Sequence, residues 1–244
     1  MSKIIVGLLP KVELYTTNDP YLDLYMFVNN YPKKVFEAGA IPIGLTLNDG
    51  EISEDQLDLC DAFIIPGGTR IDKSYYRVLE YARRTNKPVL GICAGMQAMA
   101  IYSVIYDECV KKNVDPMDNE EFRVLYDEMK TTNPTLYKLP EDNFHFHHST
   151  RDTIEECKHD ITIYDDTLLQ SVYNSNTTRV VSYHSSAIKR MGSIFTQSAE
   201  ASDDVIEGIE NKDMLWMGVQ YHPEIDENDV LIEQYVRKIE RRNR

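Results

Sequence analysis

Apolar runs alternate with segments of helical periodicity along the first half of the chain. The runs cover residues 3–9, 41–47, 61–68 and 87–93, and turn residues close the first three, as is typical of buried strands. Apolar positions recur at helical spacing between them, over residues 30–39, 72–86 and 94–106. Strands that alternate with helices in this way predict a parallel sheet covered on both faces.

Strand-like segments dominate the second half, at residues 161–164, 178–183, 193–200, 205–210 and 214–220. A closing helix over 229–242 carries one apolar stripe, formed by Leu231, Ile232, Tyr235, Val236 and Ile239. No repeat or low-complexity linker divides the chain. We therefore expect a single domain over residues 1–244, an α/β three-layer sandwich with a doubly wound, mostly parallel sheet. In such folds the site lies at the carboxyl ends of the strands.

Residues 107–150 break the alternation. They are polar and acidic, contain three prolines, and include one amphipathic segment at residues 119–130. We interpret them as an insertion with its own helix near a rim of the sheet. One hypothesis is that the insertion forms a wall beside the leaving group of a substrate, where its acidic residues would favour a cationic or neutral amine. A solvated appendage or an oligomer contact is the alternative.

Composition narrows the classes of function. The 26 basic and 40 acidic residues give a net charge of −14, which disfavours binding to nucleic acid or to anionic membrane faces. The apolar run at residues 4–10 is too short for a signal peptide or a membrane span. The four cysteines show no C-x-x-C spacing, so neither a zinc knuckle nor a disulfide framework is indicated. We expect a cytoplasmic protein.

Cys93 is the first candidate for chemistry, because it lies between Gly91 and Gly95 at the end of an apolar run. It can be a small buried hydrophobe at a strand end. Alternatively, the glycines permit a tight strand-to-helix turn that presents the thiol. The positive end of a helix dipole would favour the thiolate, which is the nucleophilic form.

A base and an orienting group for that base follow far downstream. His222 and Glu224 are two positions apart, so in an extended segment they face the same way and the carboxylate can hold the imidazole. Cys93, His222 and Glu224 thus form a predicted catalytic triad. An isolated His-Pro-Glu at the surface is the alternative interpretation.

A glycine pair could supply an oxyanion hole. Gly67 and Gly68 end the predicted strand at 61–68, and their N–H groups can approach a bound carbonyl closely. The N–H of Ala94, at the start of the predicted helix, is the second candidate donor. A plain turn is the alternative for the glycines.

Three segments, at residues 66–68, 91–97 and 218–224, resemble the sequence marks of the class I glutamine amidotransferase-like superfamily in the expected order. The stand-alone γ-glutamyl hydrolases, of the γ-glutamyl-γ-aminobutyrate hydrolase type, are most similar, on residues 19–43 and 180–188. The resemblance covers about residues 3–235 without the insertion. It implies a flavodoxin-like fold of this superfamily.

The resemblance also implies roles for individual residues. Cys93 would be the nucleophile, His222 the base and Glu224 its orienting partner. The oxyanion donors would be Gly68 and Ala94. The substrate pocket would include Gly67, Gln97, Ser182, Tyr183 and His184. Gln97 could instead fill a polar niche in its helix, and His184 could be a hydrogen-bonded buried histidine.

The implied reaction is hydrolysis of the γ-glutamyl amide bond of a small substrate, through a thioester and without a cofactor. Relatives of this branch usually have arginine at the position of Ala94, so the leaving amine stays open. One alternative is a glutaminase subunit that supplies ammonia to a separate synthetase partner. Another is a catalytically silent binding protein. Whether the chain forms a homodimer is left open.

The histidines between 145 and 148 suggest a metal site, because alternation would place His145 and His147 on one strand face, with His148 and Asp152 nearby. No downstream spacing completes such a site, so we expect a polar rim and no bound metal. The resemblance marks His148 and His159 as a histidine pair without assigning a role. The cysteines expected to be unreactive are Cys60, Cys109 and Cys157.

Overall fold

The computed structural model describes residues 3–14, 23–48, 51–116, 119–145 and 153–243. Within these residues the main sheet has nine strands, in the order β4-β1-β5-β6-β13-β12-β11-β8-β9. Their bounds, in the same order, are Ile41–Gly44, Ile5–Leu8, Ala62–Ile65, Val89–Ile92, Trp216–Val219, Ile206–Asn211, Thr196–Ala201, Lys158–Ile163 and Thr177–Val181.

The sheet has a parallel part and an antiparallel extension. Strands β4, β1, β5, β6 and β13 pair in parallel with their neighbours. Strands β12, β11, β8 and β9 continue the sheet in antiparallel pairings. The predicted α/β sandwich is confirmed. Strand β13 is the last parallel strand, so the chain that follows it emerges beside the end of β6.

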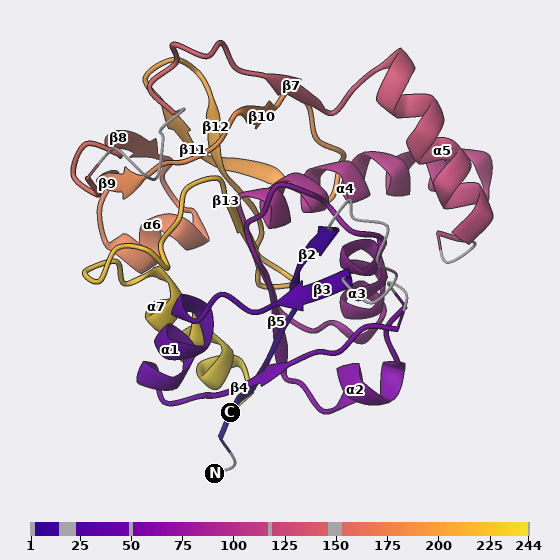
Figure 1. The fold of residues 1–244 in the computed structure, drawn as a ribbon, viewed down its shortest axis with the longest axis horizontal. Helices are drawn as coiled ribbons and strands as arrows, with labels where there is room; N and C mark the ends of the chain where they lie inside the picture. The colour runs from indigo at the N-terminus through magenta and orange to yellow at the C-terminus, as the bar shows by residue number, and fades with distance from the viewer. Residues whose placement is uncertain (1–2, 15–22, 49–50, 117–118, 146–152, 244) are drawn as a thin grey trace.

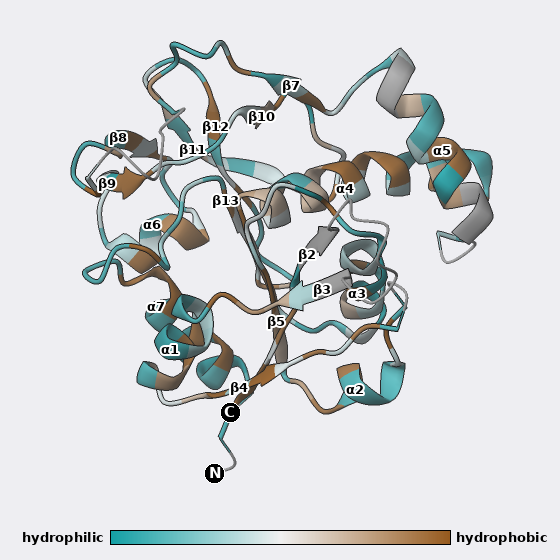
Figure 2. Cartoon of the chain, viewed as in Figure 1, coloured by the Kyte–Doolittle hydropathy of each residue, from teal (hydrophilic) through white to brown (hydrophobic). Residues whose placement is uncertain are grey.

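Helices cover both faces of the sheet and produce the predicted three layers (Figure 1). On one face lie α1 (Asn30–Glu37), α6 (Leu168–Tyr173) and α7 (Leu231–Arg242), whose apolar residues join one core cluster. On the other lie α2 (Glu54–Asp58), α3 (Lys73–Thr85) and α4 (Ala94–Lys112), which contribute to a second cluster. The predicted stripe on α7 is fully buried. Figure 2 shows hydrophobic residues along β4 and β5 and mixed colouring on the outer helices.

Helix ends follow the sequence signals. Asp72 begins α3, and its side chain accepts a hydrogen bond of 2.9 Å from the Ser74 N–H. Asn86 ends the same helix with φ 56°, and Gly39 follows α1 with φ 90°, both in the left-handed region that terminates helices. Among the helices in the described ranges, none combines the length and the apolar character needed to cross a bilayer.

The region expected to be an insertion begins later than predicted, because α4 continues through residues 107–112. Beyond it, α5 (Asn119–Thr132) packs against α3 and α4, with the rings of Tyr76 and Phe122 5.1 Å apart. A short strand, β7 (Leu136–Lys138), pairs with β10 (Ser186–Ile188). The sequence analysis anticipated neither this pair nor the hairpin of β2 (Lys11–Leu14) and β3 (Asp23–Met26).

Candidate active site

Cys93 stands at the junction between β6 and α4. Its backbone has φ 49° and ψ −106°, a sparsely populated conformation for a residue other than glycine. A Cβ atom at Gly95 would collide with the carbonyl oxygen of Ile65, and one at Gly91 would collide with the sulfur of Met99. The glycines therefore allow β5, β6 and α4 to approach closely. The predicted tight strand-to-helix turn is present.

His222 and Glu224 follow β13 and form a hydrogen-bonded pair. The Nδ1–H of His222 donates to Oε1 of Glu224 over 2.7 Å, because a carboxylate oxygen can only accept. The backbone N–H of His222 donates to the carbonyl of Val181 over 2.8 Å, which fixes the segment against β9. Both side chains are buried.

The charge state of His222 follows from its neighbours. Burial lowers the pKa of the imidazole, but the Glu224 carboxylate and the Cys93 sulfur raise it more, so that the pKa lies well above its usual value. The buried Nε2 atom has no hydrogen-bond partner within the described residues. This nitrogen is the one available for proton exchange with a thiol or a leaving group.

Gly67 lies between the nucleophile candidate and the base candidate. A Cβ atom at Gly67 would be 2.7 Å from Cε1 of His222 and 3.3 Å from Cβ of Cys93. The two side chains thus meet at one point above the ends of β5, β6 and β13. The structure brings together all three residues of the predicted triad.

Tyr31, at the start of α1, connects the triad to the glycine pair. Its hydroxyl donates to Oε1 of Glu224 over 2.8 Å and accepts from the N–H of Gly67 over 3.0 Å. Burial, and then the Glu224 carboxylate, raise the pKa of the Tyr31 hydroxyl well above its usual value. The sequence analysis missed this residue, since a tyrosine before a proline at a helix start gives no distinctive signal.

Tyr31→Phe is expected to lower kcat/KM by about tenfold, because Glu224 loses a donor that fixes its carboxylate and Gly67 loses its acceptor. Steady-state kinetics and thermal unfolding measure the two consequences. Tyr235→Phe is the matched control, since this buried tyrosine donates to the Leu215 carbonyl away from the site. Equal kinetic losses in both variants would contradict a positioning role for Tyr31.

The N–H of Gly67 is occupied by Tyr31, which leaves the donors of Gly68 and Ala94 as candidates for an oxyanion hole. The N–H of Ala94 belongs to the first turn of α4 and therefore has no acceptor within the helix. Gly68 lines the cavity in front of Cys93. The predicted pair of donors is compatible with this arrangement.

A cavity of about 440 Å³ opens in front of Cys93. Of the predicted pocket residues, Gly67, Gln97, Tyr183 and His184 line it. Ser182 does not: it is fully buried, and its hydroxyl lies 3.2 Å from Nδ1 of His145. The lining residues that the sequence analysis did not name are Lys11, Val28, Tyr31, Thr69, Ser185, Ser186 and Ile225.

Gln97 is held in place by its amide group. Nε2 donates to the carbonyl of Ser186 over 3.0 Å and to Oε1 of Gln220 over 3.1 Å. Its side-chain carbonyl remains as the group that can meet a ligand. The first of these contacts also ties α4 to β10, so Gln97 fills a polar niche while it lines the cavity.

The described part of the 107–150 region contributes no residue to the lining of this cavity. Instead, Pro116, Phe122 and Tyr126 line a different cavity between α3 and α5, with a volume of about 670 Å³. The hypothesis of a wall beside the leaving group therefore receives no support from residues 107–116 and 119–145. Residues 117–118 and 146–150 lie outside the description.

The histidines that meet in space differ from those that the sequence suggested. His147, His148 and Asp152 lie outside the described residues. His145 approaches His184 and His159, with ring centroids 4.7 and 4.5 Å away, respectively. Glu207 of β12 lies among them, and burial raises the pKa of its carboxyl group to about 7. The sequence analysis missed Glu207 because nothing around it differs from an ordinary strand.

The chain is similar to several known proteins. A glutamine amidotransferase-like protein of Rickettsia prowazekii is 28% identical, with 91% of this chain and 92% of that protein covered. CTP synthase of Thermotoga maritima is 29% identical, over 73% of this chain but only 34% of the synthase.

Among solved structures, the glutaminase domain of Trypanosoma brucei CTP synthase with bound acivicin superimposes with a TM-score of 0.65. It is 17% identical, with 98% of this chain and 94% of that domain covered, so the match concerns the fold alone. The sequence model of the glutamine amidotransferase class-I family matches residues 21–230. This match spans most of the chain, and the protein therefore belongs to the class I glutamine amidotransferase family.

Proposed function

We propose that the protein hydrolyses the γ-glutamyl amide bond of a small substrate and releases glutamate and an amine. The observation that carries the proposal is the meeting of Cys93 and His222 at Gly67, in front of a cavity of about 440 Å³. A nucleophile, a base and an orienting carboxylate are the groups that acyl transfer requires. The cavity is large enough for a glutamyl group and a small amine.

The proposed reaction proceeds through a γ-glutamyl thioester. The sulfur of Cys93 attacks the γ-carbonyl, and the N–H groups of Gly68 and Ala94 stabilise the oxyanion. The imidazolium of His222 protonates the leaving amine through Nε2. The same nitrogen then takes a proton from water, which attacks the thioester and releases glutamate.

The pocket residues suggest how a glutamyl group would be held. Lys11 and the hydroxyls of Ser185 and Ser186 line the cavity with Gln97. A cation and neutral donors suit the α-carboxylate, and the side-chain carbonyl of Gln97 suits the α-amino group. The stand-alone γ-glutamyl hydrolases provide the sequence resemblance that favours this substrate class.

A glutaminase role is the second candidate, and the CTP synthase relatives support it. In that case the leaving amine is ammonia, and a separate synthetase partner would receive it. The two functions use the same triad and differ in their dependence on a partner. A further proposal is that residues 1–244 act as one catalytic domain.

A substrate screen separates the two functions. The purified chain is tested with glutamine, γ-glutamyl amines and a γ-glutamyl anilide, and Cys93→Ala serves as the inactive control. Turnover of γ-glutamyl amines without any partner supports the hydrolase. Turnover confined to glutamine and stimulated by a co-purified synthetase supports the glutaminase, whereas the absence of both activities contradicts the proposal.

Selective alkylation provides a chemical test of the nucleophile. We expect iodoacetamide near neutral pH to modify Cys93 first, because Cys93 lines the cavity next to the imidazole of His222. Burial raises the pKa of the Cys60 thiol to about 11, which suppresses its thiolate. Peptide mapping identifies the labelled residue. Faster labelling of Cys60, Cys109 or Cys157 would argue against the assignment.

Glu224→Gln is expected to shift the alkaline limb of the pH profile of kcat/KM to lower pH. The Glu224 carboxylate raises the pKa of His222, so removal of its charge lowers that pKa. The imidazolium then loses, at a lower pH, the proton that the leaving amine needs. Glu210→Gln is the control, because this buried carboxylate contacts Leu168 rather than the triad. An unchanged limb in Glu224→Gln would mean that another group sets it.

A further inference from the structure

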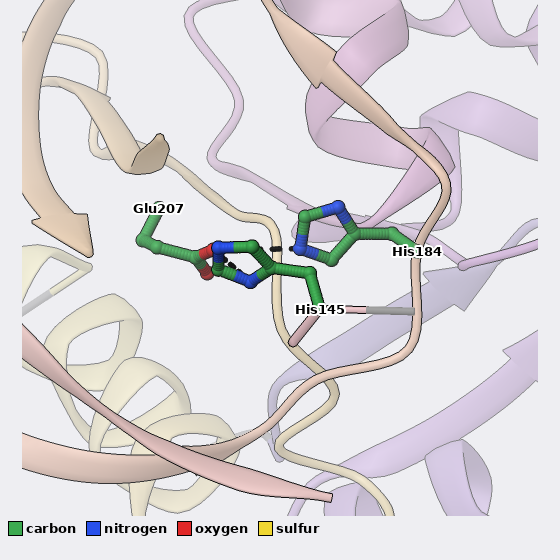
Figure 3. Close-up of side chains that lie close together, drawn as sticks. All are labelled: His145, His184 and Glu207. Atoms are coloured by element: carbon green, nitrogen blue, oxygen red, sulfur yellow. Dashed lines mark ion pairs between the residues drawn. The ribbon is translucent and has the colours of Figure 1, made fainter. Parts of the chain in front are cut away.

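A second group of titratable side chains lies outside the triad, where four separate segments meet. This histidine–glutamate cluster consists of His145, His159, His184 and Glu207. Figure 3 shows the side chains of His145, His184 and Glu207 pointing toward one another. Oε1 of Glu207 lies 3.4 Å from Nδ1 of His145, 3.4 Å from Nε2 of His184 and 3.8 Å from Nε2 of His159.

In each histidine of the cluster, the ring nitrogen that points away from Glu207 has a hydrogen-bond acceptor; we call it the outer nitrogen, and the other one the inner nitrogen. These acceptors are oxygens of a carboxylate or of backbone carbonyls, so the outer nitrogens carry the protons. In a neutral imidazole the inner nitrogen then presents a lone pair toward Glu207. The contacts are His145 Nε2 to Asp203 Oδ1 at 3.1 Å, His159 Nδ1 to the Asp160 carbonyl at 3.1 Å, and His184 Nδ1 to the Ser186 carbonyl at 3.0 Å.

The Glu207 carboxylate is fully buried, and neither of its oxygens has a hydrogen bond within the described residues. The hydroxyl of Ser182 can donate to Nδ1 of His145 over 3.2 Å, and an ion bound at this nitrogen would replace that hydrogen bond. A buried carboxylate that faces three lone pairs is costly unless a cation or additional protons lie between them.

We propose that the histidine–glutamate cluster binds one divalent transition-metal ion, with zinc as the best match. Tetrahedral zinc with bonds of about 2.0–2.1 Å holds its ligand atoms roughly 3.3–3.5 Å apart. The distances from Glu207 Oε1 to Nδ1 of His145 and to Nε2 of His184, both 3.4 Å, agree with this spacing, so these three residues are the ligands. His159 Nε2 is farther away, at 3.8 Å, and lies beside this ligand set. Imidazole ligands favour zinc over magnesium or calcium, which prefer oxygen.

The hydrogen bonds at the outer nitrogens correspond to those that hold histidine ligands in zinc centres. A carboxylate or carbonyl on the far nitrogen fixes the ring and its tautomer, as in known zinc centres. Asp203 does this for His145, and it is more exposed than the cluster itself. Ligand atoms from His145, His184 and Glu207 lie within 4.8 Å of one another, close enough for one ion to reach all of them.

The position of the site indicates a structural ion. His184 belongs to the segment whose Tyr183, Ser185 and Ser186 line the cavity in front of Cys93. The backbone carbonyl of Glu207 accepts from the N–H of Gln220 over 3.0 Å, two residues before His222. A bound ion would therefore fix one wall of the cavity to the sheet behind the base. The inference stands independently of the substrate.

Metal content of the full chain tests the proposal. After chelation, exposure to ZnCl₂ and desalting, we expect about one zinc ion per chain, measured by inductively coupled plasma mass spectrometry. Glu207→Gln and His145→Asn should each weaken binding by at least about 100-fold, because each removes one ligand atom. Glu210→Gln is the matched control, since it removes a buried carboxylate from the same strand and should retain the zinc.

Cys93 and His222 are a competing source of zinc binding, so the titration is repeated with Cys93→Ser. Retention of zinc supports the cluster, and loss of zinc in this variant alone overturns the proposal. Cobalt(II) bound to wild type should give tetrahedral d–d bands without a thiolate charge-transfer band. This spectrum remains informative if Glu207→Gln does not fold.

Thermal unfolding supplies a further readout. Zinc at 100 times its Kd should raise the Tm of the wild type by roughly 5–10 °C and leave the Tm of His145→Asn nearly unchanged. Failure of the wild type to bind zinc or cobalt would overturn the proposal. Protons shared between Glu207 and the histidines would then stabilise the buried carboxylate. Each result is obtained without an activity assay, so it does not depend on the proposed hydrolysis.

Discussion

Cys93→Ala is expected to lower kcat by about 10⁴-fold or more, and His222→Ala should lose nearly as much. The two residues act as one unit, because the imidazole exchanges the proton that the sulfur and the leaving amine require. Glu224→Gln should lose less, since it orients His222 through a single 2.7 Å hydrogen bond and the amide can still accept it. Steady-state hydrolysis of a γ-glutamyl anilide measures all three losses.

The double variant distinguishes a triad from three independent contributions. Cys93→Ala combined with His222→Ala should be no worse than Cys93→Ala alone, because the base has nothing to activate once the sulfur is absent. Cys60→Ala is the control for removal of a buried thiol away from the cavity. Small and equal losses in the three single variants would remove the triad from the mechanism.

Gly67→Ala is expected to lower kcat/KM by about 100-fold while the protein remains folded. The new methyl group would lie 2.7 Å from Cε1 of His222, which is closer than carbon atoms can approach. The imidazole must then move away from Cys93, and displacements of this size are costly when reacting groups have to be aligned. The measurement is kcat/KM together with Tm.

Gly68→Ala is the comparison for this effect. Its methyl group would lie 3.3 Å from Cγ of Lys11 and 3.8 Å from the carbonyl oxygen of Arg70, so a shift of a few tenths of an ångström in the lysine accommodates it. We expect a loss of less than about tenfold. If the two alanine variants behave alike, the contact between Gly67 and His222 does not govern the reaction.

The central fold could be predicted because buried parallel strands are short, continuous apolar runs. The runs at 61–68 and 87–93 became β5 and β6, and the stripe at 231–239 became the buried face of α7. Their signals are local, since burial on both faces leaves little choice of residue. The triad prediction used the same signals, since Cys93 directly follows β6 and His222 lies three residues past Val219, the end of β13.

The elements that escaped prediction depend on partners far along the chain. Strand β7 has three residues, and it exists because it pairs with β10 about fifty positions later. Residues 107–112 look polar in sequence, yet they continue α4, which ends at the left-handed residue Asn113. No local pattern separates such a polar last turn from the start of an insertion.

Contacts between side chains were harder to predict than helices and strands. Tyr31 reaches Glu224 only because α1 and the segment after β13 lie at the same end of the sheet. Likewise, Glu207 meets three histidines from three other segments, so no spacing in the sequence could reveal the cluster. Ser182 was placed in the pocket by its neighbours in sequence, whereas its side chain is fully buried and its hydroxyl lies next to His145.

The hydrogen-bonded pairing of β6 with β13 has a consequence for the tolerance of the chain to change. Cys93 directly follows β6, and its N–H donates to the carbonyl of Val219 at the end of β13, 2.7 Å away. The strand ends that lead to the sulfur and to the imidazole are therefore one interstrand step of about 4.8 Å apart. Loops between these strands can lengthen, shorten or diverge during evolution without altering that spacing, as long as β9 remains to accept the N–H of His222.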